Sequence, residues 1–137
     1  MVLDSGAAEH VTDDADVPGY KVEPSWGSRH GKGFIAANGA KIANKGQVTL
    51  SLVTSDGQAI DSTFQVCETN KPLWSVGKIC DAGCKVIFEP TKAEVIKCST
   101  GKTVCAFQRN GGGLYVASLK LTKLKDAAKT TFARQGK

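Results

Sequence analysis

The chain has 137 residues, of which 41% are hydrophobic and 23% are charged, and its 18 Lys and Arg outnumber its 13 Asp and Glu. This length favours one domain, and the ordinary composition argues against wholesale disorder. No apolar run approaches the ~18 residues of a membrane helix, and the first residues lack the pattern of a signal peptide. We therefore expect a soluble, non-exported chain of the cytoplasm, with no membrane partner.

A short apolar stub opens the chain and a long polar segment follows it. Val2-Leu3 indicates the end of a strand, which Gly6 then interrupts. Residues 12–32 are rich in Gly, Pro and Asp, a composition typical of a surface connection. Connections of this length in a small domain are usually functional or disordered.

Two turn signals predict hairpins. Asn38-Gly39 separates the apolar segments 33–37 and 40–42, and a two-residue Asn-Gly turn needs positive φ at both positions. Asp56-Gly57 predicts a second hairpin between strands at 47–54 and 60–66. Apolar residues alternate with more polar ones along the strand at 47–54, so we expect that strand to bury one face.

The second half of the chain predicts one helix and several strands. Apolar residues at helical spacing favour a helix over Pro72–Gly83, with Pro72 in its first turn and Gly83 just past its end. Strand signals follow at 85–88, 93–98, 103–107 and 114–121. About eight short strands with one short helix indicate an all-β barrel or sandwich. We expect Trp74 and Phe88 in its core.

The C-terminus is basic. Residues 120–137 hold six Lys and Arg against one acid, Asp126. Such a segment can contact nucleic acid or another acidic partner, although a solvated tail is the commoner case. We assign residues 1–121 to the folded domain and 122–137 to a basic tail or linker, through which nucleic acid is a weak candidate partner.

The five cysteines indicate reduced thiols rather than a metal centre. An odd count without a signal peptide is typical of a reducing compartment. The spacing has no close C-x2-C pair, and neither His10 nor His30 falls at a ligand spacing, so we expect no metal site. Burial as small apolar residues explains the pattern better. The cysteines are Cys67, Cys80, Cys84, Cys98 and Cys105.

The segment Asp4-Ser5-Gly6-Ala7 is the candidate for chemistry, because it directly follows the strand stub. A carboxylate at a strand end, a hydroxyl and a glycine suit a loop that is used twice. Two copies place two aspartates side by side, and these share one proton because adjacent like charges cannot both ionise. One then acts as general base on a water and the other as general acid. On the tripeptide alone, an ordinary Asx turn is the competing interpretation.

Several blocks of the chain, spanning residues 2–121, resemble the copia-type aspartic proteases of LTR retrotransposon Gag–Pol polyproteins, which are relatives of the retropepsins. Asp-Ser-Gly-Ala followed by His10-Val11-Thr12 is similar to the family's signature. Residues 34–42 and 46–50 look like its flap hairpin and the strand after it. Residues 73–88 look like its Leu-Leu-Ser-Val segment, and Gly113-Leu114-Tyr115 resembles the segment that closes the domain.

The resemblance implies a role for each matched residue and a closed, retropepsin-like barrel. Asp4 would be catalytic, Ser5 would bond across a dimer, and Gly6 and Ala7 would shape the loop. The flap would comprise Ala36, Ala37, Asn38, Gly39 and Ala40. Leu73, Trp74 and Ser75 would support the catalytic loop, with Ser75 standing where retropepsins have glycine. No role in the chemistry is evident for His10, for which we expect capping or packing.

The function implied is that of a homodimeric aspartic endopeptidase acting on a polypeptide, the retrotransposon polyprotein, at acidic pH and without metal or organic cofactor. Only one Asp-Ser-Gly occurs, so two chains would be needed. The alternative is a non-catalytic, co-opted barrel that serves as a binding or structural module. Ala8 in place of the family's Thr or Ser motivates it. So do the three residues before Asp4, which favour an internal polyprotein piece or a domesticated copy.

Overall fold

The computed structural model describes residues 1–36, 38–122 and 130–131. Its fold is mostly β, which confirms the all-β prediction. The strands of the first half are β1 Val2–Asp4, β2 Val11–Thr12, β3 Phe34–Ile35, β4 Lys41–Ile42, β5 Gly46–Val53 and β6 Ala59–Val66. Those of the second half are β7 Leu73–Ser75, β8 Cys84–Phe88, β9 Lys92–Lys97, β10 Thr103–Arg109, β11 Tyr115–Val116, β12 Lys120–Leu121 and β13 Thr130–Thr131. The helices are η1 Asp14–Asp16, α1 Trp26–Arg29 and α2 Val76–Asp81.

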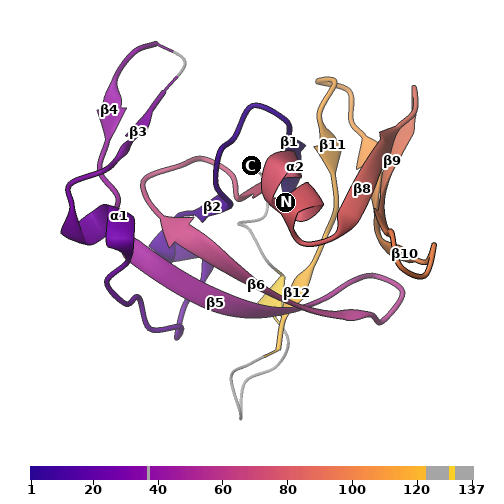
Figure 1. The fold of residues 1–137 in the computed structure, drawn as a ribbon, viewed down its shortest axis with the longest axis horizontal. Coiled ribbons are helices and arrows are strands. Elements are labelled where there is room, and N and C mark those ends of the chain that lie inside the picture. The colour runs from indigo at the N-terminus through magenta and orange to yellow at the C-terminus, as the bar shows by residue number, and fades with distance from the viewer. Residues whose placement is uncertain (37, 123–129, 132–137) are drawn as a thin grey trace.

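Eleven of these strands form one sheet in the order β13-β12-β5-β6-β2-β7-β1-β11-β10-β9-β8, and β3 and β4 form a separate pair. The long β5–β6 hairpin runs along one side, the strands β8–β11 stand at the other, and β1, β2 and β7 lie between them (Figure 1). Among the described residues no pairing joins β13 to β8, so the closed barrel is not confirmed. Pairing of β12 with β13 carries the sheet beyond residue 121.

The core lies on the inner face of this curved sheet. Val48, Leu50 and Leu52 of β5 are buried while Thr49 between them is exposed, so the predicted alternation is confirmed. Apolar residues of β6, β9 and β10 meet them: Phe64, Val66, Ala93, Val95, Cys105 and Phe107. Full burial of one such large side chain stabilises the fold by about 1.5–3 kcal/mol. The two halves of the chain therefore share one core.

Three turns of the sheet have the same form. In each, the backbone N of the residue before a three-residue loop donates to the carbonyl of the residue after it: Ala36 to Ala40, Thr54 to Gln58 and Asn110 to Leu114. The last loop residue is a glycine at positive φ: Gly39 at 85°, Gly57 at 88° and Gly113 at 84°. Both predicted hairpins are confirmed, but the expected two-residue turn at Asn38-Gly39 was wrong. A three-residue loop that ends in a left-handed glycine also matches the twist of the strands.

The predicted helix over Pro72–Gly83 was wrong in its first third. Leu73–Ser75 is strand β7, because it pairs in parallel with β1 over its whole length. Ser75 then caps α2, its side chain accepting a hydrogen bond from Lys78 N. Gly83, at φ 88°, ends the helical segment as predicted.

Other predictions from the sequence needed correction. Residues 12–32 are not wholly a surface connection, because Val17 is 2% exposed and lies in the core. The single strand expected at 114–121 is two short ones, since β11 pairs with β1 and β12 with β5. Trp74 is buried as expected, whereas Phe88 is 43% exposed because it ends β8, the edge strand of the sheet.

The cysteines divide into two groups. The predicted burial is confirmed for Cys67 and Cys105 and was wrong for Cys80 and Cys98, which are exposed, while Cys84 is partly buried. Burial raises the pKa of the Cys105 thiol to about 12, and burial followed by the charge of Asp13 raises that of Cys67. No group of three His, Cys, Asp or Glu side chains gathers as a metal site in the described part of the chain.

Candidate active site

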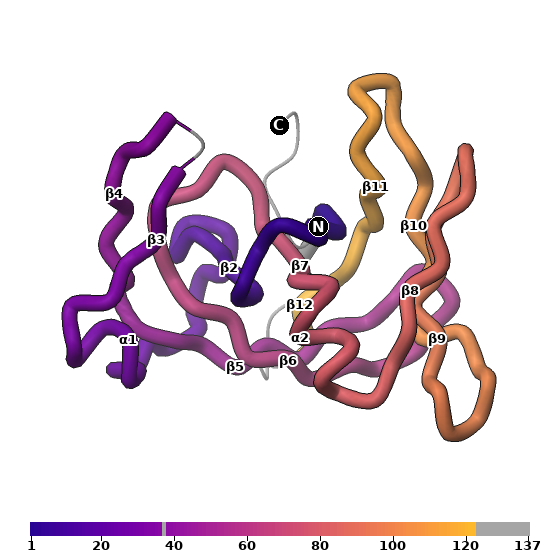
Figure 2. Tube along the Cα trace, turned by 45° about the horizontal axis from the view of Figure 1, so that its top comes forward, coloured from indigo at the N-terminus to yellow at the C-terminus, as the bar shows by residue number. Residues whose placement is uncertain are grey.

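Asp4 lies where β1 ends, at the centre of the sheet. Its neighbour on one side is β7, in parallel register with Val2 opposite Leu73 and Asp4 opposite Ser75. On the other side β11 pairs with β1, with Val2 opposite Val116. Figure 2 shows β1 beside β7 in the middle of the molecule. Because strands on both sides hold β1, the position of the Asp4 backbone is fixed.

The two carboxylate oxygens of Asp4 differ. Oδ1 accepts a hydrogen bond from the backbone N of Gly6 at 2.7 Å. This is the Asx-turn geometry that the sequence offered as the competing interpretation. Oδ2 has no hydrogen-bond partner within the described ranges. One oxygen is thus held by the chain, and the other is free to bind a water or a second carboxyl group.

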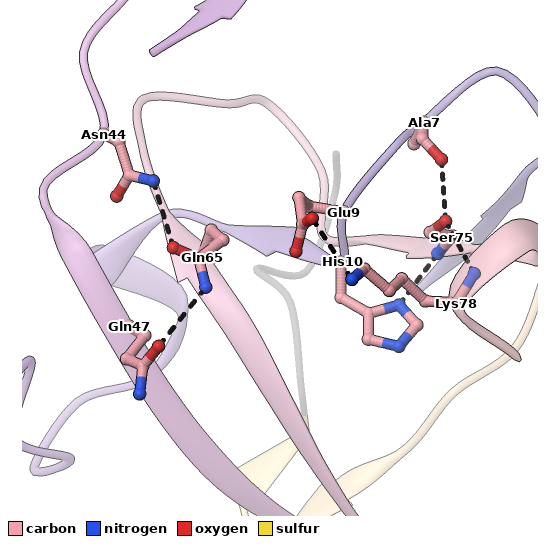
Figure 3. Close-up of polar contacts among 8 residues, drawn as sticks. All are labelled: Ala7, Glu9, His10, Asn44, Gln47, Gln65, Ser75 and Lys78. Atoms are coloured by element: carbon pink, nitrogen blue, oxygen red, sulfur yellow. Dashed lines mark hydrogen bonds and ion pairs between the residues drawn. The ribbon is translucent and has the colours of Figure 1, made fainter. Parts of the chain in front are cut away.

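Three contacts hold the loop after Asp4 against β7 and α2 (Figure 3). The Ser75 hydroxyl donates to the carbonyl of Ala7 at 2.7 Å. The backbone N of Ser75 donates to Nδ1 of His10 at 2.9 Å. Lys78 Nζ lies 3.3 Å from Glu9 Oε2, a partly exposed pair worth at most about 1 kcal/mol. Ser75 therefore contacts the loop with both its backbone and its side chain.

The packing role expected for His10 is confirmed, and its hydrogen bond with the Ser75 backbone adds a support for the loop that the sequence did not predict. Its ring lies 5.3 Å from the ring of Phe64 and 6.0 Å from that of Trp74, centroid to centroid. Burial, followed by the positive charge of Lys78, lowers the pKa of His10 to about 4. The ring is therefore neutral at physiological pH, as an acceptor for the Ser75 N–H must be.

A cavity of about 360 Å³ opens beside Asp4. Its walls are mostly apolar, from Val2, Leu3, Leu73, Phe88, Leu114 and Tyr115. Asp4, Ser5 and Lys71 add the polar groups. The rings of Phe88 and Tyr115 meet edge to face at 5.0 Å, and the Tyr115 hydroxyl donates to the Glu89 carbonyl at 2.7 Å. Strand pairing brings these residues together from distant parts of the chain, so no local sequence pattern marks them.

The remaining predicted residues fall in two places. Ser5 and Gly6 are exposed beside Asp4, and Leu73, Trp74 and Ser75 form the strand next to it. Ala36, Asn38, Gly39 and Ala40 lie at the end of the β3–β4 hairpin, and none of them lines the cavity. That hairpin stands at one end of the molecule, away from β1, in both Figure 1 and Figure 2. Ala37 lies outside the described residues.

The comparisons with known proteins return nothing: no family model, no curated protein and no solved structure matches this chain. No helix among the described residues has the length and apolar character needed to cross a membrane.

Proposed function

We propose that this chain is an aspartic endopeptidase with a retropepsin-like barrel, active as a symmetric homodimer on a retrotransposon-type polyprotein. The proposal rests on the position of the Asp4 carboxylate and on its contacts. Its carboxylate ends a central strand, one oxygen is held by Gly6 N, and the other is open beside an apolar cavity. A loop held by Ser75, His10 and Lys78 supports it, because a catalytic group must be held firmly to act.

The chemistry needs two such carboxyl groups. One, ionised, takes a proton from a bound water as the water oxygen bonds to the peptide carbonyl carbon. The other, protonated, gives its proton to the carbonyl oxygen, which yields a tetrahedral diol. The C–N bond then breaks with its electron pair on nitrogen, which takes the proton from the carboxyl group that had accepted it from water. One diol hydroxyl returns a proton to the other carboxylate, so the two products are an amine and a carboxylic acid. Each chain supplies one Asp4, so a second copy supplies the other.

The apolar walls of the cavity favour a polypeptide substrate with a large apolar side chain near the cut bond. Burying such a side chain contributes about 1.5–3 kcal/mol to binding.

An aspartate pair that shares one proton predicts faster cleavage at acidic pH. A cleavage rate that stays constant from about pH 4 to 9 would contradict this prediction.

The first test is cleavage of a peptide library at about pH 5 by the wild-type protein, by Asp4→Asn, and by the wild type with pepstatin. Asp61→Asn is the matched control, since Asp61 is an exposed carboxylate on β6. We expect Asp4→Asn and pepstatin to abolish cleavage and Asp61→Asn to retain it. Failure of the folded wild type to cleave any peptide would reject the proposal.

A mixing experiment tests the dimer. If both aspartates of a pair are needed and chains pair at random, an equal mixture of wild type and Asp4→Asn retains about a quarter of the activity of wild type at the same total concentration. Retention of half the activity would indicate that each chain works alone.

The placement of the β3–β4 hairpin favours one other candidate, a non-catalytic barrel kept for binding. A flap that covers substrate should border the cavity beside Asp4, and none of its described residues does. A protein that stays monomeric at micromolar concentration and cleaves nothing, yet retains a peptide from the library, would support this candidate.

A further inference from the structure

A second surface lies at the end of the molecule that carries α1 and the β3–β4 hairpin. From Pro24 to Ser55 the sequence has no Asp or Glu, while it contains Arg29, Lys32, Lys41 and Lys45. This stretch contains α1, the β3–β4 hairpin and all of β5 (Figure 1). This end of the protein thus carries positive charge along a continuous stretch of chain, with the exposed Glu23 directly before it, and this feature is separate from the cavity beside Asp4.

An exposed aromatic pair lies at the centre of this surface. Trp26 begins α1 and is 65% exposed. Its indole stacks on the ring of His30, with centroids 4.3 Å apart and planes 22° apart, and His30 Nδ1 contacts the Trp26 carbonyl oxygen at 2.7 Å. The large exposure of the indole leaves its other face open to solvent. A flat aromatic face of this kind can stack against another ring.

Three basic residues belong to α1 and to the chain segments next to it. Arg29 belongs to α1, and the backbone N of Lys32 donates to the Gly27 carbonyl at 2.8 Å. Gly27 in turn lies against Asn44, so the helix rests on the base of the hairpin that carries Lys41. None of these three cations forms an ion pair within the described part of the chain, whereas Lys45 lies 4.0 Å from Asp14. Their charge is therefore available to a partner.

We propose that Trp26, His30, Arg29, Lys32 and Lys41 form a binding surface for single-stranded nucleic acid, named here the Trp26 surface. Cations track the phosphates, and a base stacks on the open face of the indole, a contact worth ~1–3 kcal/mol per base and independent of sequence. The carboxylates of an acidic peptide could meet the charges, but only its aromatic residues would offer a ring to the indole, whereas every nucleotide carries one. The surface is distinct from the basic tail, most of which lies outside the described residues, and it does not depend on proteolytic activity.

The test uses intrinsic fluorescence, because the two tryptophans report separately. Trp74 is 4% exposed and lies in the core, while Trp26 is exposed on the proposed surface. We expect a 12-nucleotide oligouridine to quench the wild-type emission and Trp26→Ala to bind it about tenfold more weakly, as measured with a labelled oligonucleotide. An absence of quenching at oligouridine concentrations that saturate the labelled assay would overturn the proposal.

Charge variants give the second measurement. The triple variant Arg29→Gln, Lys32→Gln, Lys41→Gln should lower the slope of log affinity against log salt by about 2, since each phosphate contact contributes about 0.7 for a single strand. The matched control, Lys85→Gln, Lys97→Gln, Lys102→Gln, removes three exposed lysines from the β8–β10 region and should leave the slope nearly unchanged. Circular dichroism checks that both variants are folded. Equal losses in both triples would overturn the proposal.

Two competing sources of binding are resolved in the same assay. Neutralising Lys123, Lys125 and Lys129 with glutamine should leave most of the affinity, and its loss would assign binding to the tail instead. Polyglutamate should compete poorly at equal charge, and competition equal to that of oligouridine would assign the surface to acidic peptides.

Discussion

Ser75 is the residue through which β7 supports the Asp4 loop, and Ser75→Ala is the most informative single change. The side chain is fully buried, donates to the Ala7 carbonyl at 2.7 Å, and accepts from Lys78 N at 3.2 Å. Alanine removes both hydrogen bonds and leaves the backbone bond to His10 in place. The change is also small enough to create only a minor cavity.

The two losses can be estimated separately. Loss of an N-cap costs about 1 kcal/mol. The partly buried carbonyl of Ala7 also loses its hydrogen-bond partner, which costs a further ~1–2 kcal/mol. The free energy of unfolding should therefore fall by about 2–3 kcal/mol, which lowers the Tm by roughly 8–12 °C at about 4 °C per kcal/mol for a chain of this size.

Ser25→Ala serves as the matched control. Ser25 is also a buried N-cap, accepting from Ser28 N at 3.1 Å, but its hydroxyl supports no second loop. It should lose only the capping contribution of about 1 kcal/mol. Urea unfolding of both variants, followed by circular dichroism, gives the comparison. If Ser75→Ala costs no more than Ser25→Ala, the bond to Ala7 contributes nothing and our reasoning about the loop is wrong.

Three further predictions concern stability and reactivity. The pKa of His10 is lowered to about 4 in the folded chain, below its ordinary value near 6.5, so the unfolded chain takes up the proton first. The contribution of His10 to the free energy of unfolding is fully present above about pH 6.5 and falls by about 2 kcal/mol toward pH 4, a figure that allows for solvent screening at this half-buried ring. Urea unfolding of His10→Gln at several pH values should lack this decrease. Parallel pH dependences of the free energy of unfolding in the two proteins would contradict the prediction. Gly46→Ala should lower the Tm far more than Gly57→Ala, because a Cβ at Gly46 meets the Glu23 carbonyl oxygen at 2.3 Å while one at Gly57 meets nothing within 4 Å; equal shifts would refute the steric argument. At pH 8, alkylation followed by mass spectrometry should find the exposed Cys98 modified at least about 100-fold faster than Cys105, whose pKa is raised to about 12, and similar rates would show that the Cys105 region opens readily.

The local parts of the fold were predictable from the sequence. Turns with glycine, strand alternation and the end of α2 at Gly83 all depend on neighbours within a few residues, and the structure confirms them. The sequence misplaced the start of α2 because Leu73–Ser75 has helical spacing, and only pairing with β1 makes it a strand. A contact between residues about 70 positions apart leaves no local pattern.

The residues around Asp4 were predictable from the sequence, whereas those that line the rest of the cavity were not. Asp4, Gly6 and Ser75 were named from motifs, and they lie together. Packing was expected for His10, but its hydrogen bond with the Ser75 backbone could not be predicted, because it joins residues 65 positions apart. Lys71, Phe88 and Tyr115 border the cavity only because β7, β8 and β11 converge on β1, and the expected burial of Phe88 overlooked that β8 is an edge strand.

The pairing of β1 also determines when Asp4 acquires its surroundings during synthesis. This strand precedes both of its partners, β7 and β11, in the chain, and the Met1 carbonyl accepts a hydrogen bond from the N–H of Ala117. Such distant contacts form slowly, since a long loop must close before they contribute stability. A chain translated only as far as residue 100 therefore lacks β11, one of the two strands that flank β1. The cavity beside Asp4 is assembled only after the chain has emerged past Ala117.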